Sequence, residues 1–347
     1  MVSNAWFVRF RTRITDRYDD WREDLSSGSS WHLRLLAIVL VYVVITLILG
    51  GYWSSEPEPI PLVNNNQTAI VGVSTTTALI NVASTVLNKP GGYLSNDVAL
   101  PGVWLDNIPS WEYGALIQVR DLSKTLRESF SRSQSQSTED EDLVIAEPRF
   151  NFDTQSWIFP SSESVYREGI EYLQRYQTRL ADSGKANAQF YARADNLSSW
   201  LATVESRLGS LSQRLSASVG QRRINTDLAG EENASQATPA PKELIIKTPW
   251  LEIDDVFYEA RGSAWALVHF LKAAEVDFAD ILQKKNALIS LRQIIRELEA
   301  TQKPVYSMVI LNGSGFGMMA NHSLVMASYL SRAHAAIIDI RELLAQG

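Results

Sequence analysis

A glycine-rich stretch near the end of the sequence holds the residue types most typical of ligand chemistry. The segment "LNGSGFGMMANHS" (311–323) follows the apolar run VYSMVIL and precedes a long helix-like run. A strand, a glycine loop and a helix in this order are typical of nucleotide sites, because the helix N-terminus attracts a phosphate that glycines allow to approach. The candidate ligand-binding residues are Gly313, Gly315, Gly317, Asn321 and His322.

The detailed spacing does not match a nucleotide motif. The glycines form G-x-G-x-G, Met318 stands where a dinucleotide fingerprint needs its third glycine, and no lysine follows as in a phosphate-binding loop. A structural explanation is a tight glycine corner, with residues 304–311 as a short helix that ends at Asn312-Gly313. A narrower ligand hypothesis stays open, in which the amides ahead of the helix starting at Asn321 hold an anionic group.

Other chemistry-bearing patterns are not found in the sequence. The chain has four histidines and no cysteine, and no two histidines have the spacing of a helical metal site. No G-x-S-x-G motif is present, and the many carboxylates fall on amphipathic helices, where they form solvated faces. We therefore predict no catalytic, metal-binding or cofactor-binding residues.

An uncharged apolar run near the N-terminus predicts a transmembrane helix. With its flanks, the segment from Trp31 to Trp53 spans roughly 33 Å as a helix, which matches a hydrocarbon core of about 30 Å. Trp31 at one end and Tyr52 and Trp53 at the other are typical membrane-interface anchors. A cleaved signal peptide is the alternative, but more than thirty residues precede this segment and bulky aromatic residues follow it.

The flanking charges predict the orientation of this helix. Arginines precede it or lie in its first turn, whereas no lysine or arginine follows until Lys89. The positive-inside rule then places the N-terminus in the cytoplasm and the C-terminal domain in the periplasm of a bacterial inner membrane. The net charge of −7 gives no indication of nucleic-acid binding.

The remaining sequence predicts four further regions. Residues 1–30 form a cytoplasmic arm with one apolar helical face, suited to the lipid surface or to a partner protein. Residues 54–67 form an extended, proline-rich linker, and residues 68–347 form a periplasmic helical domain. Within that domain, the composition of 131–142 and 220–242 is typical of disordered loops.

Helical patterns dominate the predicted domain. We expect helices over 68–88, 111–131, 161–182, 187–219, 250–302 and 321–345. Residues 143–160, with "RFNF" and "SWIF", give the clearest β signal and predict a small hairpin, with which "ELIIKTPW" (243–250) can pair.

Two regions repeat apolar residues at alternating spacings of three and four. The first seam is Phe190, Ala194, Leu197, Leu201, Val204, Leu208, Leu211 and Leu215, and the second is Phe257, Ala260, Ala264, Leu267, Leu271, Ala274, Phe278 and Ile281. This pattern predicts a long, coiled-coil-like antiparallel helix pair within the bundle. The alternative is that one seam mediates self-association between chains.

Two segments, "AEPRFNFDTQSWIFPSSES" (146–164) and "LNGSGFGMMANHSLVMASYLSRAHAAIIDIR" (311–341), resemble a proteobacterial family of inner-membrane proteins catalogued as a domain of unknown function. The resemblance covers most of the chain, implies an inner-membrane location and carries over no activity.

The functional expectation follows from these features together. It is a membrane-anchored structural or interaction module of the cell envelope, whose partners are the lipid bilayer and an envelope protein or a second copy of the chain. The alternatives are a periplasmic ligand-binding or sensory module and an envelope enzyme.

Overall fold

The computed structural model describes residues 31–60, 70–134, 137–182, 187–225, 241, 243–307 and 309–346. The chain divides into two compact units, Met1–Tyr52 and Trp53–Gly347. The predicted amphipathic arm (1–30) and most of the predicted linker-like loop (220–242) lie outside the described residues.

The first element, α2, is a helix from Trp31 to Trp53. It is long and apolar enough to cross a membrane or to serve as a signal sequence. Nearly all of its apolar side chains are exposed. A soluble core helix would bury such side chains, so the composition of α2 needs an apolar surrounding that the described part of the chain does not supply.

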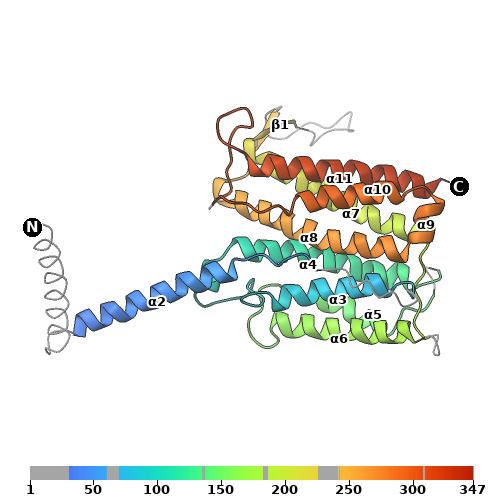
Figure 1. Ribbon diagram of the computed structural model, residues 1–347, viewed down its shortest axis with the longest axis horizontal. Coiled ribbons are helices and arrows are strands. Elements are labelled where there is room, and N and C mark those ends of the chain that lie inside the picture. Colours follow the sequence, from blue (N-terminus) through green and yellow to red (C-terminus); the bar gives the residue numbers. More distant parts are fainter. Residues whose placement is uncertain are drawn as a thin grey trace, which may run out of the picture. The chain divides into compact units, whose positions relative to one another are not determined.

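The second unit is a bundle in which successive helices of the chain mostly run in opposite directions, whereas its two central helices run parallel (Figure 1). Its central helices are α4 (Asn107–Thr125, continued by a π turn to Phe130) and α8 (Ile253–Asp277). On one side lie α3 (Val73–Asn88), α5 (Leu143–Phe150) and α6 (Ser162–Ala181). On the other lie α7 (Ala194–Ser216), α10 (Leu288–Ala300) and α11 (His322–Ala345). The mostly helical fold predicted from the sequence is confirmed.

The two central helices touch backbone to backbone. A Cβ added to Gly262 of α8 would stand 1.9 Å from the Trp111 carbonyl oxygen. A Cβ added to Gly114 of α4 would stand 2.0 Å from the Glu259 carbonyl oxygen. The Ser263 hydroxyl donates to the Gly114 carbonyl at 3.0 Å. Every residue of α8 from 260 to 271 is buried, so this helix forms the axis of the core.

The two predicted seams bury their residues but do not form the expected pair. Helix α7 packs mainly on α11, and α8 packs mainly on α4. The spacing of apolar residues identifies a buried face, but several helices in a bundle present such faces, so spacing alone does not select the partner. The coiled-coil pairing of these two helices is thus not confirmed. The predicted helix over 250–302 is also divided, with α9 (Ala279–Lys284) between α8 and α10.

The hairpin predicted over 143–160 is wrong, because residues 143–150 form α5. The buried residues of α5 recur at helical spacing and face α6. The backbone carbonyls that follow are satisfied by side chains rather than by a neighbouring strand: Arg120 donates to the carbonyls of Phe150 and Phe152, and the Tyr166 hydroxyl to that of Phe152. Side-chain donors therefore replace the expected β ladder.

A small antiparallel sheet does exist, at a different place. Strand β1 (Gln221–Ile224) pairs with β2 (Glu243–Ile246), with Gln221 opposite Ile246. The "ELII" segment is thus a strand as predicted, but its partner follows α7. Short 3-10 turns, Gly102–Trp104, Ala217–Val219 and Trp250–Glu252, lie in the connections.

Candidate functional site

The segment that leaves α2, residues 54–60, is held against the bundle by an ion pair. We call this segment the strap. The Glu56 carboxylate accepts from Arg261 Nε at 2.8 Å and from Nη2 at 2.6 Å. Arg261 Nη1 donates to the carbonyls of Thr301 and Lys303, both at 2.8 Å. One buried guanidinium thus joins the strap, α8 and the connection from α10 to α11.

A second contact fixes the end of the strap through a histidine. The Ile60 amide donates to His269 Nε2 at 2.9 Å, and His269 Nδ1 lies 2.7 Å from the Trp265 carbonyl oxygen. These partners require a neutral ring with its hydrogen on Nδ1. Burial lowers the pKa of His269 below its usual value, which favours the same neutral form.

The strap contacts come from one face of α8. Residues 261, 265 and 269 are spaced by four, so their side chains lie along the same side of the helix. This site was not predicted from the sequence. One signal could have found it: Arg261 is the only Lys, Arg, Asp or Glu in the apolar stretch 260–271, and a charge in a buried helix needs a partner.

A buried ion pair supports the neighbouring connection from α3 to α4. Lys89 Nζ lies 2.6 Å from Glu112 Oε1, and both side chains are fully buried. The same carboxylate accepts from the amides of Leu94 and Ser95, each at 2.9 Å. The Trp53 ring lies against Gly91, where an added Cβ would stand 2.8 Å from Trp53 Cγ. The connection from α3 to α4 is therefore organised around the buried Lys89–Glu112 pair, and Trp53, the last residue of α2, packs against it.

The predicted membrane anchors lie at the two ends of α2. Trp31 and Tyr52 are exposed, as interfacial side chains facing lipid would be, whereas Trp53 is half-buried and packs against the core of the second unit. Trp53 is therefore both the last residue of the apolar helix and part of the packing of the folded domain.

The glycine segment predicted as a ligand loop folds back on itself ahead of α11. Asn312 and Asn321 form an isolated antiparallel bridge. A Cβ on Gly313 would stand 2.1 Å from the Met319 carbonyl oxygen, and Gly315 has φ +82°, so both positions require glycine. Gly317 needs less room, since an added Cβ would meet only the Ser314 hydroxyl. The glycines thus close a corner, as predicted, but the short helix expected over 304–311 is wrong, because the described residues of that segment have irregular backbone.

The polar residues of this loop hold its backbone. Asn321 caps α11, because its Oδ1 accepts from the Leu324 amide at 2.9 Å while its Nδ2 donates to the Gly313 carbonyl. His322 Nδ1 accepts from the Leu311 amide at 3.1 Å, and burial lowers the pKa of His322. An anion at this helix N-terminus would compete with Asn321 for the Leu324 amide. Anion binding by this loop stays a prediction.

Two open grooves mark the surface of the bundle. One, of about 510 Å³, lies beside the glycine segment and includes Gly315, Gly317 and Asn321 with Tyr329 and Arg332 of α11. Arg332 pairs with Glu297 at 2.8 Å. The glycine segment thus lines part of this groove, but Arg332, a charged residue of the same lining, is already paired with Glu297.

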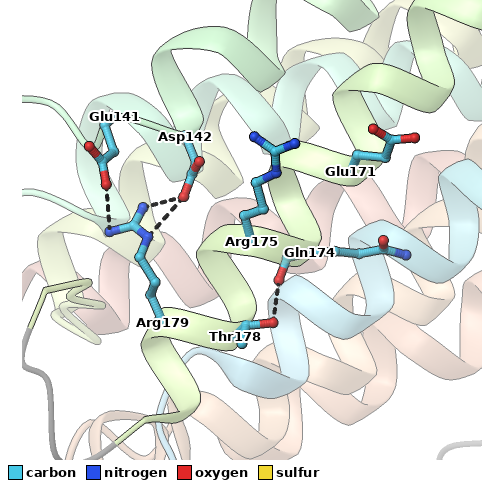
Figure 2. A pocket seen from close by; sticks show the side chains of 7 residues that line it. All are labelled: Glu141, Asp142, Glu171, Gln174, Arg175, Thr178 and Arg179. Carbon is cyan, nitrogen blue, oxygen red and sulfur yellow. Dashed lines mark hydrogen bonds and ion pairs between the residues drawn. The ribbon is translucent and has the colours of Figure 1, made fainter.

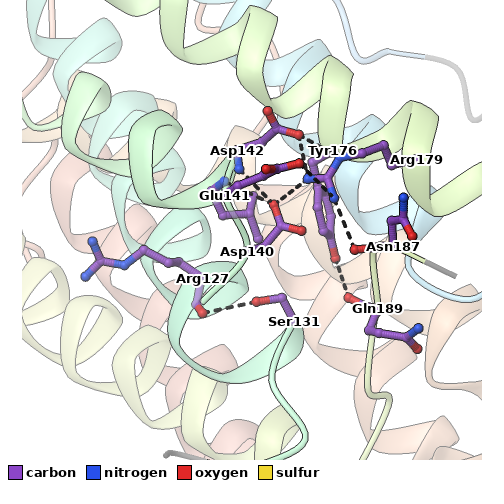
Figure 3. Close-up of polar contacts among 10 residues, drawn as sticks. Arg127, Ser131, Asp140, Glu141, Asp142, Tyr176, Arg179, Asn187 and Gln189 are labelled. Atoms are coloured by element: carbon purple, nitrogen blue, oxygen red, sulfur yellow. Dashed lines mark hydrogen bonds and ion pairs between the residues drawn. The ribbon is translucent and has the colours of Figure 1, made fainter. Parts of the chain in front are cut away.

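The other groove, of about 640 Å³, lies along α6 and is lined mostly by charged side chains (Figure 2). Arg179 closes one end, 2.5 Å from Asp142 and 2.7 Å from Asp140, and the Tyr176 hydroxyl donates to the Gln189 carbonyl at 2.7 Å (Figure 3). The Arg179 contacts hold residues 140–142 of the connection that composition predicted to be disordered, and the Tyr176 contact holds the connection from α6 to α7. Farther along α6, Glu171 and Arg175 lie at the open part of the groove.

No group of three or more metal-ligating side chains comes together among the residues that the structure describes. The buried polar groups of the strap and of the Lys89–Glu112 pair are engaged with protein partners. The contacts of the strap thus fix the segment after α2 to α8, the central helix of the bundle.

These features define a helical-bundle protein with one N-terminal helix that can span a membrane. Residues 25–347 match the model of a family described as an uncharacterized protein conserved in bacteria (DUF2333), and the chain belongs to this family. The resemblance seen in the sequence is thereby confirmed. No curated protein and no solved structure matches the chain.

Proposed function

We propose that this protein is a single-pass protein of the bacterial inner membrane whose periplasmic helical domain is a structural or interaction module of the envelope. The observation that carries the proposal is the short connection in the chain between an exposed apolar helix and the first side chain bound to the folded domain. Helix α2 ends at Trp53, and the chain is bound to α8 three residues later, at Glu56.

The same connection supports a retained anchor rather than a cleaved signal peptide. Signal-peptide cleavage takes place shortly after the apolar segment. In this chain Trp53 packs against Gly91, and the Glu56 carboxylate compensates the buried charge of Arg261. Removal of residues up to this point would leave Arg261 without its carboxylate, at a cost of about 3–5 kcal/mol for an uncompensated buried charge.

The orientation rests on the sequence flanks. Five arginines precede α2 and Arg34 lies in its first turn, whereas the segment from 54 to 88 contains neither lysine nor arginine. This asymmetry favours a cytoplasmic N-terminus and a periplasmic bundle. Reporter fusions that are active only in the cytoplasm or only in the periplasm, placed at residues 2 and 346, test it. A periplasmic signal at residue 2 or a cytoplasmic signal at residue 346 would contradict the orientation.

The interaction role predicts a protein partner or a second copy at the exposed side of the bundle. The groove along α6 is the preferred place to probe, because it is a hollow whose charged lining at Glu171 and Arg175 is open to solvent (Figure 2). A photo-crosslinking amino acid at Arg175, introduced into the full chain in living cells, should give a discrete crosslinked product of higher mass. The matched control is Ile289, an exposed position on α10.

Two results decide this test. A product at Arg175 that is weaker or missing at Ile289, and that contains one defined protein by mass spectrometry, supports an interaction module. Recovery of only the uncrosslinked chain from both positions, and from a scan of the other exposed helical faces, contradicts it.

A further inference from the structure

Several connections of the bundle meet at one end. The antiparallel course of successive helices brings together the connections α3–α4, α5–α6, α7–α8 and α10–α11 (Figure 1). Hydrogen bonds join them: Asn96 donates to the Ser156 carbonyl at 2.8 Å, and Asn312 donates to the Ser218 carbonyl at 3.1 Å. The strap belongs to the same end, since Arg261 binds both Glu56 and the carbonyls of Thr301 and Lys303. We call it the strap end.

The strap end exposes large apolar side chains on all four connections. The most prominent are Trp104, Trp157, Phe159, Trp250, Phe316 and Met318. Phe159, Phe316 and Met318 are completely or almost completely exposed. Soluble surfaces rarely gather so many large apolar side chains, so this set indicates an apolar or interfacial surrounding.

The opposite end of the bundle differs in this respect. Its connections are 61–72, 131–142, 182–193 and 278–287. Among their described residues the exposed large apolar side chains are Ile70 and Val71, which are aliphatic and less than half exposed, at 37% and 44%; the strongly exposed Ile289 stands on helix α10. Strongly exposed aromatic tips are therefore not a general property of the connections in this fold. They belong to the end from which the chain continues to α2.

The length of the chain places the strap end close to the end of α2. Glu56 follows Trp53 by three positions, and an extended chain spans at most about 11 Å over three positions. The interfacial layer on each side of the hydrocarbon core is roughly 5–7 Å thick. If α2 spans a bilayer, Glu56 and the backbone bound to Arg261 lie in this layer or directly above it.

The kinds of side chain also fit this location. Tryptophan and other aromatic residues are favoured at the boundary between lipid chains and headgroups, where their rings are partly apolar. Hydrogen bonds join the connections in two pairs, so the tips on each pair are presented together rather than singly. The occupant of this surface therefore has to be broad and to offer apolar groups beneath a polar boundary, as the interfacial layer of a bilayer does.

We propose that the strap end docks onto the membrane surface, with the tips at Phe159 and Phe316 inserted into the interfacial layer of the phospholipid leaflet from which α2 emerges. This inference rests on the proposed function, in which α2 is a membrane anchor. It makes the bundle lie against the bilayer with α6, α7 and α11 exposed at its sides, instead of hanging from a free linker.

The full chain contains no cysteine, so single cysteines carrying a nitroxide report individual positions. The chain would be placed in phosphatidylcholine nanodiscs, and collisions of the label with oxygen and with a water-soluble nickel chelate would be measured. The variants are Phe159→Cys and Phe316→Cys at the tips, Ile289→Cys at the opposite end, and Leu40→Cys in α2. All four positions are strongly exposed in the folded chain, so labelling does not disturb the core.

The proposal predicts that the labels at 159 and 316 lose nickel collisions and gain oxygen collisions relative to the label at 289. Water-like values at 159 and 316, with a lipid-like value at 40, would overturn the docking inference and leave the anchor intact. A water-like value at 40 would overturn the anchor and the inference together. Shielding of the tips in native membranes but not in lipid-only nanodiscs would mean a protein occupant and would also overturn the inference.

Discussion

Glu56 and Arg261 lie 205 residues apart in the chain and are joined by three hydrogen bonds of 2.6 to 3.0 Å. The remaining nitrogen of the guanidinium binds two backbone carbonyls at the end of α10. This pair ties the start of the folded domain to its central helix, because a buried charge gains most from a partner that satisfies it fully.

Loss of this pair should loosen the strap. Arg261→Lys keeps the charge but cannot bind a carboxylate side-on and two carbonyls at once. We expect Glu56→Ala and Arg261→Lys to lower the free energy of unfolding by about 3 kcal/mol, and to speed hydrogen exchange in residues 54–60. The control is Arg292→Gln, which removes an exposed pair with Glu275 and should cost less than about 1 kcal/mol. Equal effects of the two arginine variants would contradict a specific role for Arg261.

The buried Lys89–Glu112 pair gives a second prediction. Lys89→Met leaves the carboxylate buried without a cation, so we expect a loss of about 3–5 kcal/mol in the free energy of unfolding, measured by denaturant titration. Lys272→Met is the matched control, because Lys272 lies at the same 2.6 Å from Glu299 but both side chains are partly exposed. That control should lose at most about 1 kcal/mol. Similar losses in both variants would mean that burial does not set the strength of the Lys89 contact.

The strap contact to His269 predicts that the free energy of unfolding depends on pH. Burial lowers the pKa of His269, so the unfolded chain takes up the proton first as the pH falls below about 6.5. The contribution of His269 to the free energy of unfolding is therefore complete above that pH. It is lost as the pH falls toward the lowered pKa, with a slope of at most about 1.4 kcal/mol per pH unit. His322 contributes in the same direction, since burial lowers its pKa too.

His269→Gln isolates the first contribution. The glutamine carbonyl can accept from the Ile60 amide but does not titrate between pH 5 and 7. The free energy of unfolding of this variant should fall less steeply with decreasing pH than that of the natural chain. Parallel curves over pH 5 to 7 would show that protonation of His269 is not coupled to folding.

The glycine corner predicts a difference between two alanine variants. A Cβ at Gly313 would overlap the Met319 carbonyl oxygen, whereas one at Gly317 meets a hydroxyl that can rotate away. We expect Gly313→Ala to lower the free energy of unfolding by about 1–3 kcal/mol and Gly317→Ala to have a smaller effect. The melting temperatures of the two variants, measured side by side, check this order. A reversed order would contradict the described course of the loop.

Local signals in the sequence predicted much of the fold. The apolar run of α2 and the beginnings of α6 near residue 161 and of α11 near residue 321 were recognisable, because each depends on neighbours in the chain. Both residues are N-caps in the structure: Ser161 Oγ accepts from the Ser164 amide, and Asn321 Oδ1 accepts from the Leu324 amide.

Contacts between distant segments could not be predicted in this way. The alternation in "RFNF" favours a strand, but Arg120 and Tyr166 bind the backbone there instead. The seam on α7 shows which face of that helix is buried, but it does not show that α11 is the helix that covers this face. Arg261 and His269 were visible as polar residues in an apolar helix, yet their partners, Glu56 and Ile60, follow from tertiary packing alone.

The most direct measurement is the intact mass of the protein recovered from bacterial membranes after alkaline carbonate washing. A retained anchor predicts the full chain of 38.8 kDa in the washed membrane pellet. In spheroplasts, added protease should then degrade the bundle, whereas in intact cells the bundle should survive. A soluble product shortened by the residues up to the end of α2, or a bundle that resists protease in spheroplasts, would contradict a periplasmic domain anchored by α2.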